Sequence, residues 1–312
     1  MDRIATSSAY ASVLASLMSA QTVQSQAGEQ ISSGQQASDL KGYDGSAETL
    51  LAMQASNTQV TGYLNQTTNV ASQLSVQDLA LQQVAGAGAG ARQAIANVIA
   101  AGNGSTLMQS LQTYFQTAVS GLNTTYNGQY LFSGGQSNTQ PVTASTLSDL
   151  TAAPSLASVF QNGPLAATTH LDASTSITTG FLADQVGTPL FAALQNIQSY
   201  VDANGPFSGT LTTAQTTFLQ SQLAGLDTVN SNLNDVVAQN GVLQSQTDDA
   251  QTRLTSQQTM LGGLLSNVTS ADLAKATINL QQAQLSIQAS EQVLMSLKSS
   301  SLLNLLSPTG TG

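Results

Sequence analysis

The chain has 312 residues, of which 41% are apolar, 4% aromatic and 7% charged, and its net charge is −10. Ordinary soluble domains carry about 25% charged residues, so little charge repulsion keeps copies of this chain apart, and we expect self-association rather than a monomer solvated by amides and hydroxyls. The six cations stand singly, which excludes a nucleic-acid surface and a lipid-binding basic patch, and the absence of cysteine excludes disulfides, thiolate metal sites and a cysteine nucleophile.

The N-terminal region is the first predicted element. Apolar residues spaced three and four apart predict one helix over residues 5–31, and Gly34 suits its C-terminal cap. Arg3 and the apolar stretch 13–18 resemble a secretory leader, but serines interrupt that stretch, so an amphipathic helix is the better interpretation. Export would then use a route without a cleaved leader. No apolar run approaches the roughly 20 residues that span a bilayer, so we expect no membrane partner.

A connector separates this helix from a long helical pattern over about residues 47–101. Three glycines, Gly86, Gly88 and Gly90, lie inside the pattern. We favour the interpretation that they are small packing residues, and a hinge or a close approach between helices is the alternative. Another helix is predicted over about residues 106–122.

After this helix, the composition of the sequence and the spacing of its apolar residues change. Strand-forming residues at Tyr130–Phe132 are closed by Gly134, and alternation from Leu171 to Thr179 predicts a half-buried strand. Pro, Ser and Thr are frequent in this region. We therefore predict a small β-leaning outer insertion, residues 141–185, on which few buried groups depend.

Helical patterns return after the insertion. Thr188 and Pro189 suit the start of one helix, and a longer helix is predicted over about residues 212–268. Within the longer helix, Asp249 and Arg253 have the spacing of a helical ion pair.

The last predicted helix, from about residue 270, has the clearest pattern. Its apolar residues recur every seven positions, which keeps one apolar stripe facing a partner helix in a coiled coil. This helix can pair with the N-terminal one, and we expect the subunits to complete their core on assembly. The residues expected at the assembly interface are Leu14, Leu17, Ile31, Leu273, Leu280, Ile287, Leu294 and Leu297.

These elements predict a mainly α fold, an elongated rod of long helices with a coiled-coil pair of N- and C-terminal helices and a small β-leaning outer insertion. Five segments would build it: residues 1–44 and 270–312 as the two parts of a terminal coiled-coil domain, residues 45–140 and 186–269 as the outgoing and returning parts of a helical core domain, and residues 141–185 as a variable outer domain.

The sequence offers no credible catalytic constellation. His170 is the single histidine and no Gly-x-Ser-x-Gly elbow accompanies it, so we interpret it as an exposed structural residue. Asp248 and Asp249 are adjacent carboxylates, but neighbours on a helix point in different directions, and a solvated face is the better interpretation. Nucleotide-binding and calcium-binding loops are absent. We therefore predict no enzyme activity, no metal and no cofactor.

Several segments resemble bacterial flagellins and their hook-associated relatives. Two match the breaks and ends of the flagellin helices, namely Ile31-Ser32-Ser33-Gly34 and Ala271-Asp272-Leu273-Ala274 with the later run Leu302-Leu303-Asn304-Leu305-Leu306. Two are similar to the hook-associated protein 3 family of hook–filament junction proteins, namely Asn127–Gly135 and Asn240–Leu243. The most specific part of the resemblance is the motif Tyr130, Leu131, Phe132, Ser133 and Gly134.

The resemblance implies a secreted structural protein of the bacterial flagellum. It would leave the cell unfolded through the flagellar type III export apparatus, with an export chaperone, and form a homo-oligomer outside the cell at the hook–filament junction. Its neighbours would be the first hook-associated protein and flagellin, and its role would be to join a bending hook to a stiffer filament.

Three alternatives remain beside this function. The first is a flagellin that forms the filament itself, because the Ser-Asp-Asp-Pro-like segment frequent in the family after Gly34 is replaced here by Ala37–Asp44. The second is a secreted enzyme on a similar rod, which would need a motif such as His-Glu-x-x-His that His170 alone cannot provide. The third, a needle-tip or translocator coiled-coil protein, is disfavoured by the motif at Tyr130–Gly134.

Overall fold

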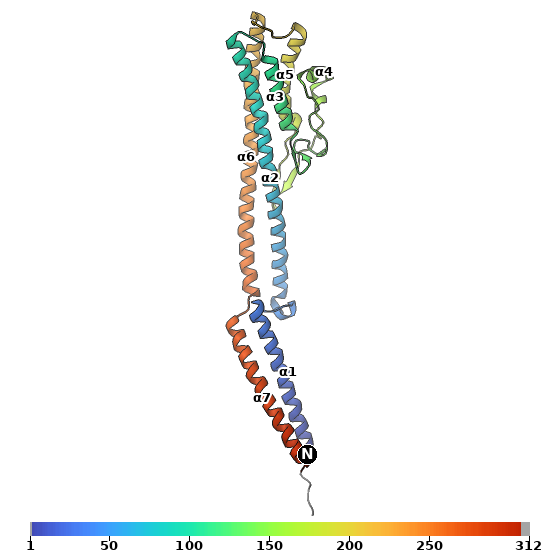
Figure 1. The fold of residues 1–312 in the computed structure, drawn as a ribbon, viewed down its shortest axis with the longest axis vertical. Coiled ribbons are helices and arrows are strands. Elements are labelled where there is room, and N and C mark those ends of the chain that lie inside the picture. The colour runs from blue at the N-terminus through green and yellow to red at the C-terminus, as the bar shows by residue number, and fades with distance from the viewer. Residues whose placement is uncertain (1, 307–312) are drawn as a thin grey trace, which may run out of the picture. The chain divides into compact units, whose positions relative to one another are not determined.

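The computed structural model describes the backbone of residues 2–306 and the side chains of residues 8–299. The mainly α fold class predicted from the sequence is confirmed, with long helices and two small antiparallel hairpins among the described residues (Figure 1). The helices are α1 (Asp2–Ser33), α2 (Ala47–Ala101), α3 (Leu107–Leu122), α4 (Leu147–Ala152), α5 (Ala183–Asn204), α6 (Thr213–Thr269) and α7 (Leu273–Leu306). The shorter elements are the 3₁₀ segments η1 (Leu40–Ser46) and η2 (Leu156–Val159) and the strands β1 (Thr125–Tyr126), β2 (Gln129–Tyr130), β3 (Thr168–His170) and β4 (Ser176–Thr178).

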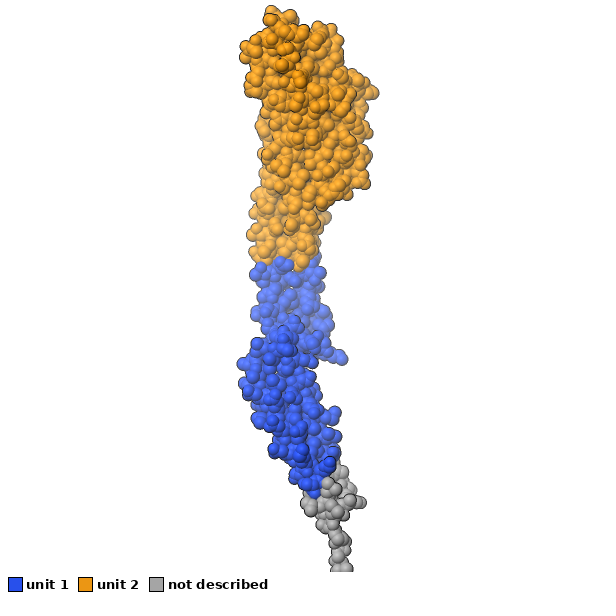
Figure 2. All heavy atoms as spheres, in the orientation of Figure 1, with its two compact units in different colours: residues 1–59, 257–312 blue, residues 60–256 orange. Residues whose placement is uncertain are grey.

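The chain folds into two compact units, which Figure 2 distinguishes by colour. Unit 1 combines residues 1–59 with residues 257–312, and unit 2 comprises residues 60–256. The long helices α2 and α6 contribute to both units. The five-segment domain division expected from the sequence stays a prediction.

In unit 1, the break after α1 lies beside the break between α6 and α7. Gly34 ends α1 with a φ of +68°, a left-handed conformation that suits glycine and confirms it as the end of this helix. The N–H of Gln36 donates to the Thr269 carbonyl at 2.7 Å, and the N–H of Ala271 donates to the Gly34 carbonyl at 2.9 Å. These two bonds satisfy backbone groups that the helix ends leave open and hold both breaks side by side.

Unit 2 contains the main hydrophobic core, to which α2, α3, α5, α6 and the segment that follows β2 contribute. Aromatic rings occupy its centre. Phe115 of α3 meets Phe191 of α5 edge to face with ring centroids 4.9 Å apart, and Phe160 stacks on the same Phe191 ring at 5.4 Å. Such pairs add specific geometry to the burial that drives this packing.

The glycines inside α2 have different surroundings. A Cβ on Gly90 would lie 2.2 Å from Cε1 of Tyr114, and a Cβ on Gly88 would lie 2.6 Å from Oδ1 of Asn230, whereas a Cβ on Gly86 would meet open space. The alternative interpretation, a close approach between elements, is therefore correct for Gly88 and Gly90. Gly86 is exposed and a Cβ there would touch nothing, so the favoured interpretation as a small packing residue does not hold at that position.

Residues 141–185 contribute more buried side chains to the core of unit 2 than their sequence suggested. Val142, Leu147, Leu150 and Phe160 are buried in the main hydrophobic cluster with residues of α3 and α5. The expectation that few buried groups depend on this segment is therefore wrong. Frequent Ser and Thr residues occupy turns and caps here, while most of the large apolar residues face the core and Leu165 is exposed.

Two element boundaries in unit 2 also differ from expectation. Helix α5 begins at Ala183 rather than at Thr188 and Pro189, because burying Ala183 and Val186 extends the helix toward its N-terminus despite the missing N–H of proline. The strand predicted from Leu171 to Thr179 is limited to Ser176–Thr178, since the preceding residues form the turn of a hairpin.

The motif Tyr130–Gly134 forms a buried turn that joins several parts of unit 2. Its strand character is limited to Gln129–Tyr130. The carbonyl of Phe132 accepts a hydrogen bond from the N–H of Ala183 at 2.9 Å, at the start of α5, and the carbonyl of Ser133 accepts one from Gly163 at 2.8 Å. Phe132 and Ser133 are fully buried. The motif thus fixes where the chain leaves α3 and where it returns into α5.

Gly134 is required for the shape of this turn. Its φ is +59°, and a Cβ there would lie 2.7 Å from the carbonyl oxygens of both Gly163 and Leu165. A larger residue would meet backbone on two sides, so only glycine fits at this position of the motif without a clash.

Candidate assembly surface

Helices α1 and α7 lie side by side in unit 1 (Figure 1), and among their described side chains the buried ones are alanines. Ala20 and Ala27 on α1 and Ala276 and Ala283 on α7 are the buried residues of the pair, and on each helix they are seven residues apart. This spacing keeps one face of each helix toward its partner. Small side chains let the backbones approach but bury little apolar area, so the contact within one chain is narrow.

The residues predicted for the assembly interface divide into two groups around this contact. Those at its edges, half-buried, are Leu17, Leu280, Ile287, Leu294 and Leu297. Those exposed to solvent are Leu14, Ile31 and Leu273, with 41%, 39% and 51% of their surface accessible. Their role as an interface between subunits remains a prediction. The side chains of Leu302–Leu306, quoted above for the flagellin resemblance, lie outside the described residues.

Large apolar side chains also cover the outer faces of the pair. On α7, Ile278 and Leu285 are seven residues apart and 54% and 66% exposed. At 3.6 residues per turn, they fall on the side opposite Ala276 and Ala283. We call Ile278 and Leu285 the outer stripe of α7.

Helix α1 has a matching outer stripe. Tyr10, Leu14 and Met18 follow each other at four-residue spacing and are 50%, 41% and 61% exposed. A helix that is apolar on more than one side is normally buried on more than one side. The seven-residue repeat of α7 was predicted from the sequence but its outer stripe was not, although the second seven-residue spacing, at Ile278 and Leu285, is a signal for it.

A shallow groove runs between α1 and α7 beside the alanine contact. Its lining consists of small and polar side chains, including Ser12, Ser16, Ser19, Gln282 and Ser286. Hydroxyls and amides in this number suit close helix packing and ordered water more than a compact apolar ligand. The groove is thus a feature of the helix pair itself.

The ion pair expected on α6 between Asp249 and Arg253 does not form. Arg253 contacts Asp172 of the β3–β4 turn, with Nη2 and Oδ2 3.3 Å apart, and not Asp249 on its own helix. An exposed pair at four-residue spacing is worth only a few tenths of a kcal/mol, so a carboxylate held in place by a neighbouring turn competes successfully. A second ion pair, Arg92 with Asp227, joins α2 to α6 nearer the main core.

The histidine and the adjacent carboxylates considered in the sequence as catalytic candidates are all exposed. His170 is exposed at the end of β3, and Asp248 and Asp249 are exposed on α6. Among the residues that the structure describes, no group of three or more His, Cys, Asp or Glu side chains lies close enough to hold a metal ion. Within that same part, no helix is both long and apolar enough to cross a bilayer.

The C-terminal third of the chain, which includes one helix of the terminal pair, is similar to a flagellin family model. Residues 223–306 match the family model described as the bacterial flagellin C-terminal helical region. This match includes most of α6 and all of α7, and so contains the α7 side of the alanine contact and the outer stripe of α7.

The particular fold is that of flagellar hook-associated proteins of the FlgL type. A structure of a flagellar hook-associated protein from Vibrio parahaemolyticus is similar with a TM-score of 0.58 and 15% sequence identity, over 71% of this chain and 96% of that one. The crystal structure of Bacillus cereus FlgL is similar with a TM-score of 0.52 and 16% identity, over 69% of this chain and 99% of that one. No curated protein sequence matches the chain.

Proposed function

We propose that the protein is a structural component of the bacterial flagellum that assembles with copies of itself and serves as the adaptor at the hook–filament junction. The observation that carries the proposal is the α1–α7 pair, which has apolar stripes on its outer faces and whose helix α7 lies in the chain segment that matches the flagellin C-terminal region. The likeness to FlgL-type folds supports the junction over the alternative, a flagellin that forms the filament itself.

The proposal includes an export route, two neighbouring proteins and a mechanical role. The chain would be exported through the flagellar type III route with the help of a chaperone and would act outside the cell. It would contact the first hook-associated protein on one side and flagellin on the other. The role is mechanical rather than catalytic: helices of neighbouring copies would cover the exposed apolar stripes that one chain leaves open.

Placing charge in the outer stripe of α7 tests the proposal. The variant Ile278→Asp with Leu285→Asp keeps the alanine contact but puts two carboxylates where we expect a neighbouring copy, which costs several kcal/mol in a buried interface. In cells that lack the wild-type copy, we expect export of the variant without retention of filaments on hooks. The charge-matched control is Gln281→Asp with Gln288→Asp, at two exposed polar positions of α7, which should support motility.

The position of the wild-type protein along the flagellum separates the two flagellar roles. Labelled protein should form one point at the hook end of each filament. Labelling along the whole filament would favour the flagellin alternative, and full-length filaments in the stripe variant would overturn assembly through this surface.

A further inference from the structure

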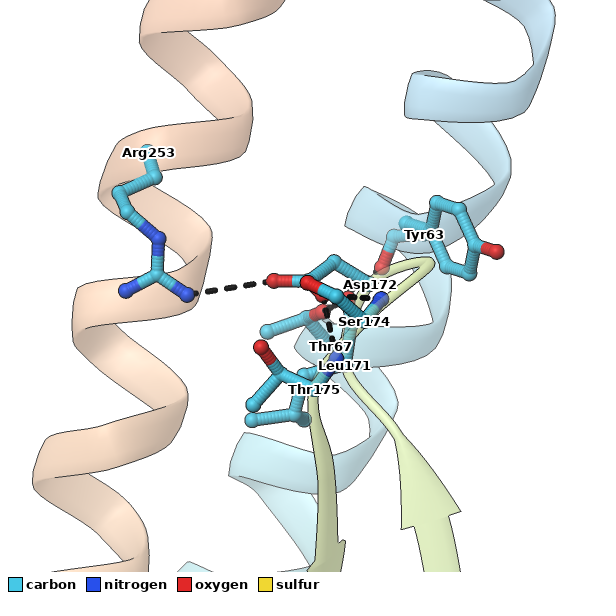
Figure 3. A network of polar contacts seen from close by, with 7 residues as sticks. All are labelled: Tyr63, Thr67, Leu171, Asp172, Ser174, Thr175 and Arg253. Atoms are coloured by element: carbon cyan, nitrogen blue, oxygen red, sulfur yellow. Dashed lines mark hydrogen bonds and ion pairs between the residues drawn. The ribbon is translucent and has the colours of Figure 1, made fainter.

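The β3–β4 hairpin of unit 2 has a turn that is organised around one carboxylate. Thr168–His170 pairs antiparallel with Ser176–Thr178, and the turn between them is shown in Figure 3. Oδ1 of Asp172 accepts hydrogen bonds from the N–H of Ser174 at 2.8 Å, the N–H of Thr175 at 2.6 Å and the hydroxyl of Ser174 at 3.0 Å. Burial alone would raise the pKa of Asp172, but these donors outweigh it and hold the pKa well below its usual value.

The same turn contacts both long helices (Figure 3). On the α2 side, the Thr67 hydroxyl lies 3.3 Å from the carbonyl oxygen of Leu171 and 2.7 Å from that of Tyr63, and it shares its proton between them. On the α6 side, Arg253 donates to the free oxygen of Asp172 at 3.3 Å. The hairpin therefore bridges the outgoing and the returning helix.

A second, small hydrophobic cluster lies beneath the hairpin. Leu171 and Ile177 of the hairpin are buried with Val70 and Leu74 of α2 and Ala250 of α6. This cluster is separate from the main core of unit 2. The hairpin thus supplies two of the apolar side chains that cover α2 and α6 in this region, and without them Val70 and Leu74 would face water.

We propose that the β3–β4 hairpin is a latch: it has a docked state, seen here, and a released state, and its docking determines whether the adjoining part of the α2–α6 pair is rigidly packed. A two-stranded hairpin with three residues in each strand is marginal by itself, so the docked state depends on the Asp172, Thr67 and cluster contacts. Segments held by a few contacts open as local units before the whole domain unfolds.

Release of the latch should loosen the packing of α2 against α6, because the turn is bonded to both helices. In the docked state, one turn joins Thr67 on α2 to Arg253 on α6, so neither helix can slide without breaking a bond. In the released state, the pair next to the hairpin would lose the bridge through the turn and keep its direct contacts, such as the bond from Gln251 to the Thr68 hydroxyl at 3.3 Å and the bond from Gln244 to the Leu74 carbonyl at 3.3 Å. The proposal goes beyond the flagellar role and does not depend on it, since it concerns only packing within unit 2.

Hydrogen–deuterium exchange of the full chain tests the latch, with Asp172→Asn as the first variant. This change removes the charge that orders the turn and pairs with Arg253, while the side chain keeps its size. We expect the amides of residues 168–179 to exchange about tenfold faster, the ratio that corresponds to losing one charge-assisted contact. The amides of α2 near residues 60–78 and of α6 near residues 243–256 should accelerate with them, while α3 and α5 keep their protection.

Two further variants keep the test decisive. Thr67→Val removes the hydroxyl on the α2 side with little change in shape, and it should produce the same pattern with a smaller increase. Asp227→Asn removes the ion pair that joins α2 directly to α6 and is the matched control, which should leave the exchange of the hairpin unchanged. Faster exchange in the hairpin alone would overturn the proposal, and so would equal acceleration across the whole of unit 2.

Discussion

The side chains of Gln77 and Asn240 meet in the interior between α2 and α6, where Nε2 of Gln77 donates to Oδ1 of Asn240 at 3.0 Å. Both residues are fully buried. Asn240 in turn donates to the carbonyl of Leu74 at 3.1 Å, and Gln77 donates to the carbonyl of Thr179 at 3.1 Å. In this alignment of the two helices the amide nitrogens of both residues find acceptors, although the buried Oε1 of Gln77 has no partner, and a slide of either helix would break these bonds. The contact therefore selects the register of α2 against α6.

Asn240→Ala should therefore destabilise unit 2. The substitution leaves one of the two N–H groups of the Gln77 amide without an acceptor in a buried site, while the bond to the Thr179 carbonyl stays, and such a loss costs about 1–3 kcal/mol. The matched control is Gln244→Ala, because Gln244 is half-buried and makes one long bond, at 3.3 Å, to the same Leu74 carbonyl. Urea unfolding monitored by circular dichroism should show a clear loss for the first variant and a small one for the second. Equal losses would contradict a special role for Asn240.

The sequence predicted the secondary structure of this region well but not the contact itself. The periodicity of α2 and α6 was visible, and Asn240 was noted within the family-like stretch Asn240–Leu243. However, a partner 163 residues away along the chain leaves no local pattern. The same limit applies to Arg253, for which Asp249 had the right local spacing while Asp172, from a distant hairpin, is the actual partner.

On the candidate assembly surface, the sequence predicted the pairing of helices but not which residues of the repeat are buried. The seven-residue repeat on α7 correctly indicated a partner helix, because periodicity depends only on local geometry. The same repeat includes Ala276 and Ala283, three residues after Leu273 and Leu280, but periodicity alone does not say which members of the repeat are buried within one chain. In the structure, Ala276 and Ala283 are buried, whereas Leu280 and Ile287 are only half-buried.

The glycines of α2 allow a direct test of close approach. Gly90→Ala should destabilise the protein by about 1–3 kcal/mol, because the new methyl group would overlap the rigid ring of Tyr114 and force it to move. Gly86→Ala is the control on the same helix, and it should stabilise the protein by about 0.5–1 kcal/mol through helix propensity alone. Thermal unfolding of both variants measures the difference. A stabilising effect at both positions would show that Tyr114 moves aside freely.

The insertion 141–185 should prove necessary for folding, contrary to the expectation from its composition. Phe160→Ala removes a ring that stacks on Phe191 in the core and should cost about 3–5 kcal/mol. Leu165→Ala lies in the same insertion but at a side chain that is 74% exposed, and it should change stability by less than about 0.5 kcal/mol. Chemical denaturation of the two variants provides the comparison. A small effect of Phe160→Ala would restore the view that the insertion can be deleted.

The isolated monomer should lose both terminal helices to limited proteolysis. The alanine contact of α1 with α7 buries little area, whereas ordering each residue costs about 1–2 kcal/mol. Trypsin suits the experiment because the chain has only six Lys and Arg residues. Lys41 lies in η1 and Lys275 near the start of α7, both exposed, so early cleavage there should release a stable fragment of residues 42–275.

Arg92 and Arg253 serve as internal controls in the same digest. Both lie inside the long helices of unit 2, where cleavage requires those helices to open, so they should be cut much later than Lys41 and Lys275. In the assembled form, neighbouring copies would cover the outer stripes, and the terminal helices should then resist as well. Mass spectrometry of timed samples measures the order of cuts. Equal resistance of the termini in monomer and assembly would show that α1 and α7 are stable as a pair and would contradict the argument that they complete their packing on assembly.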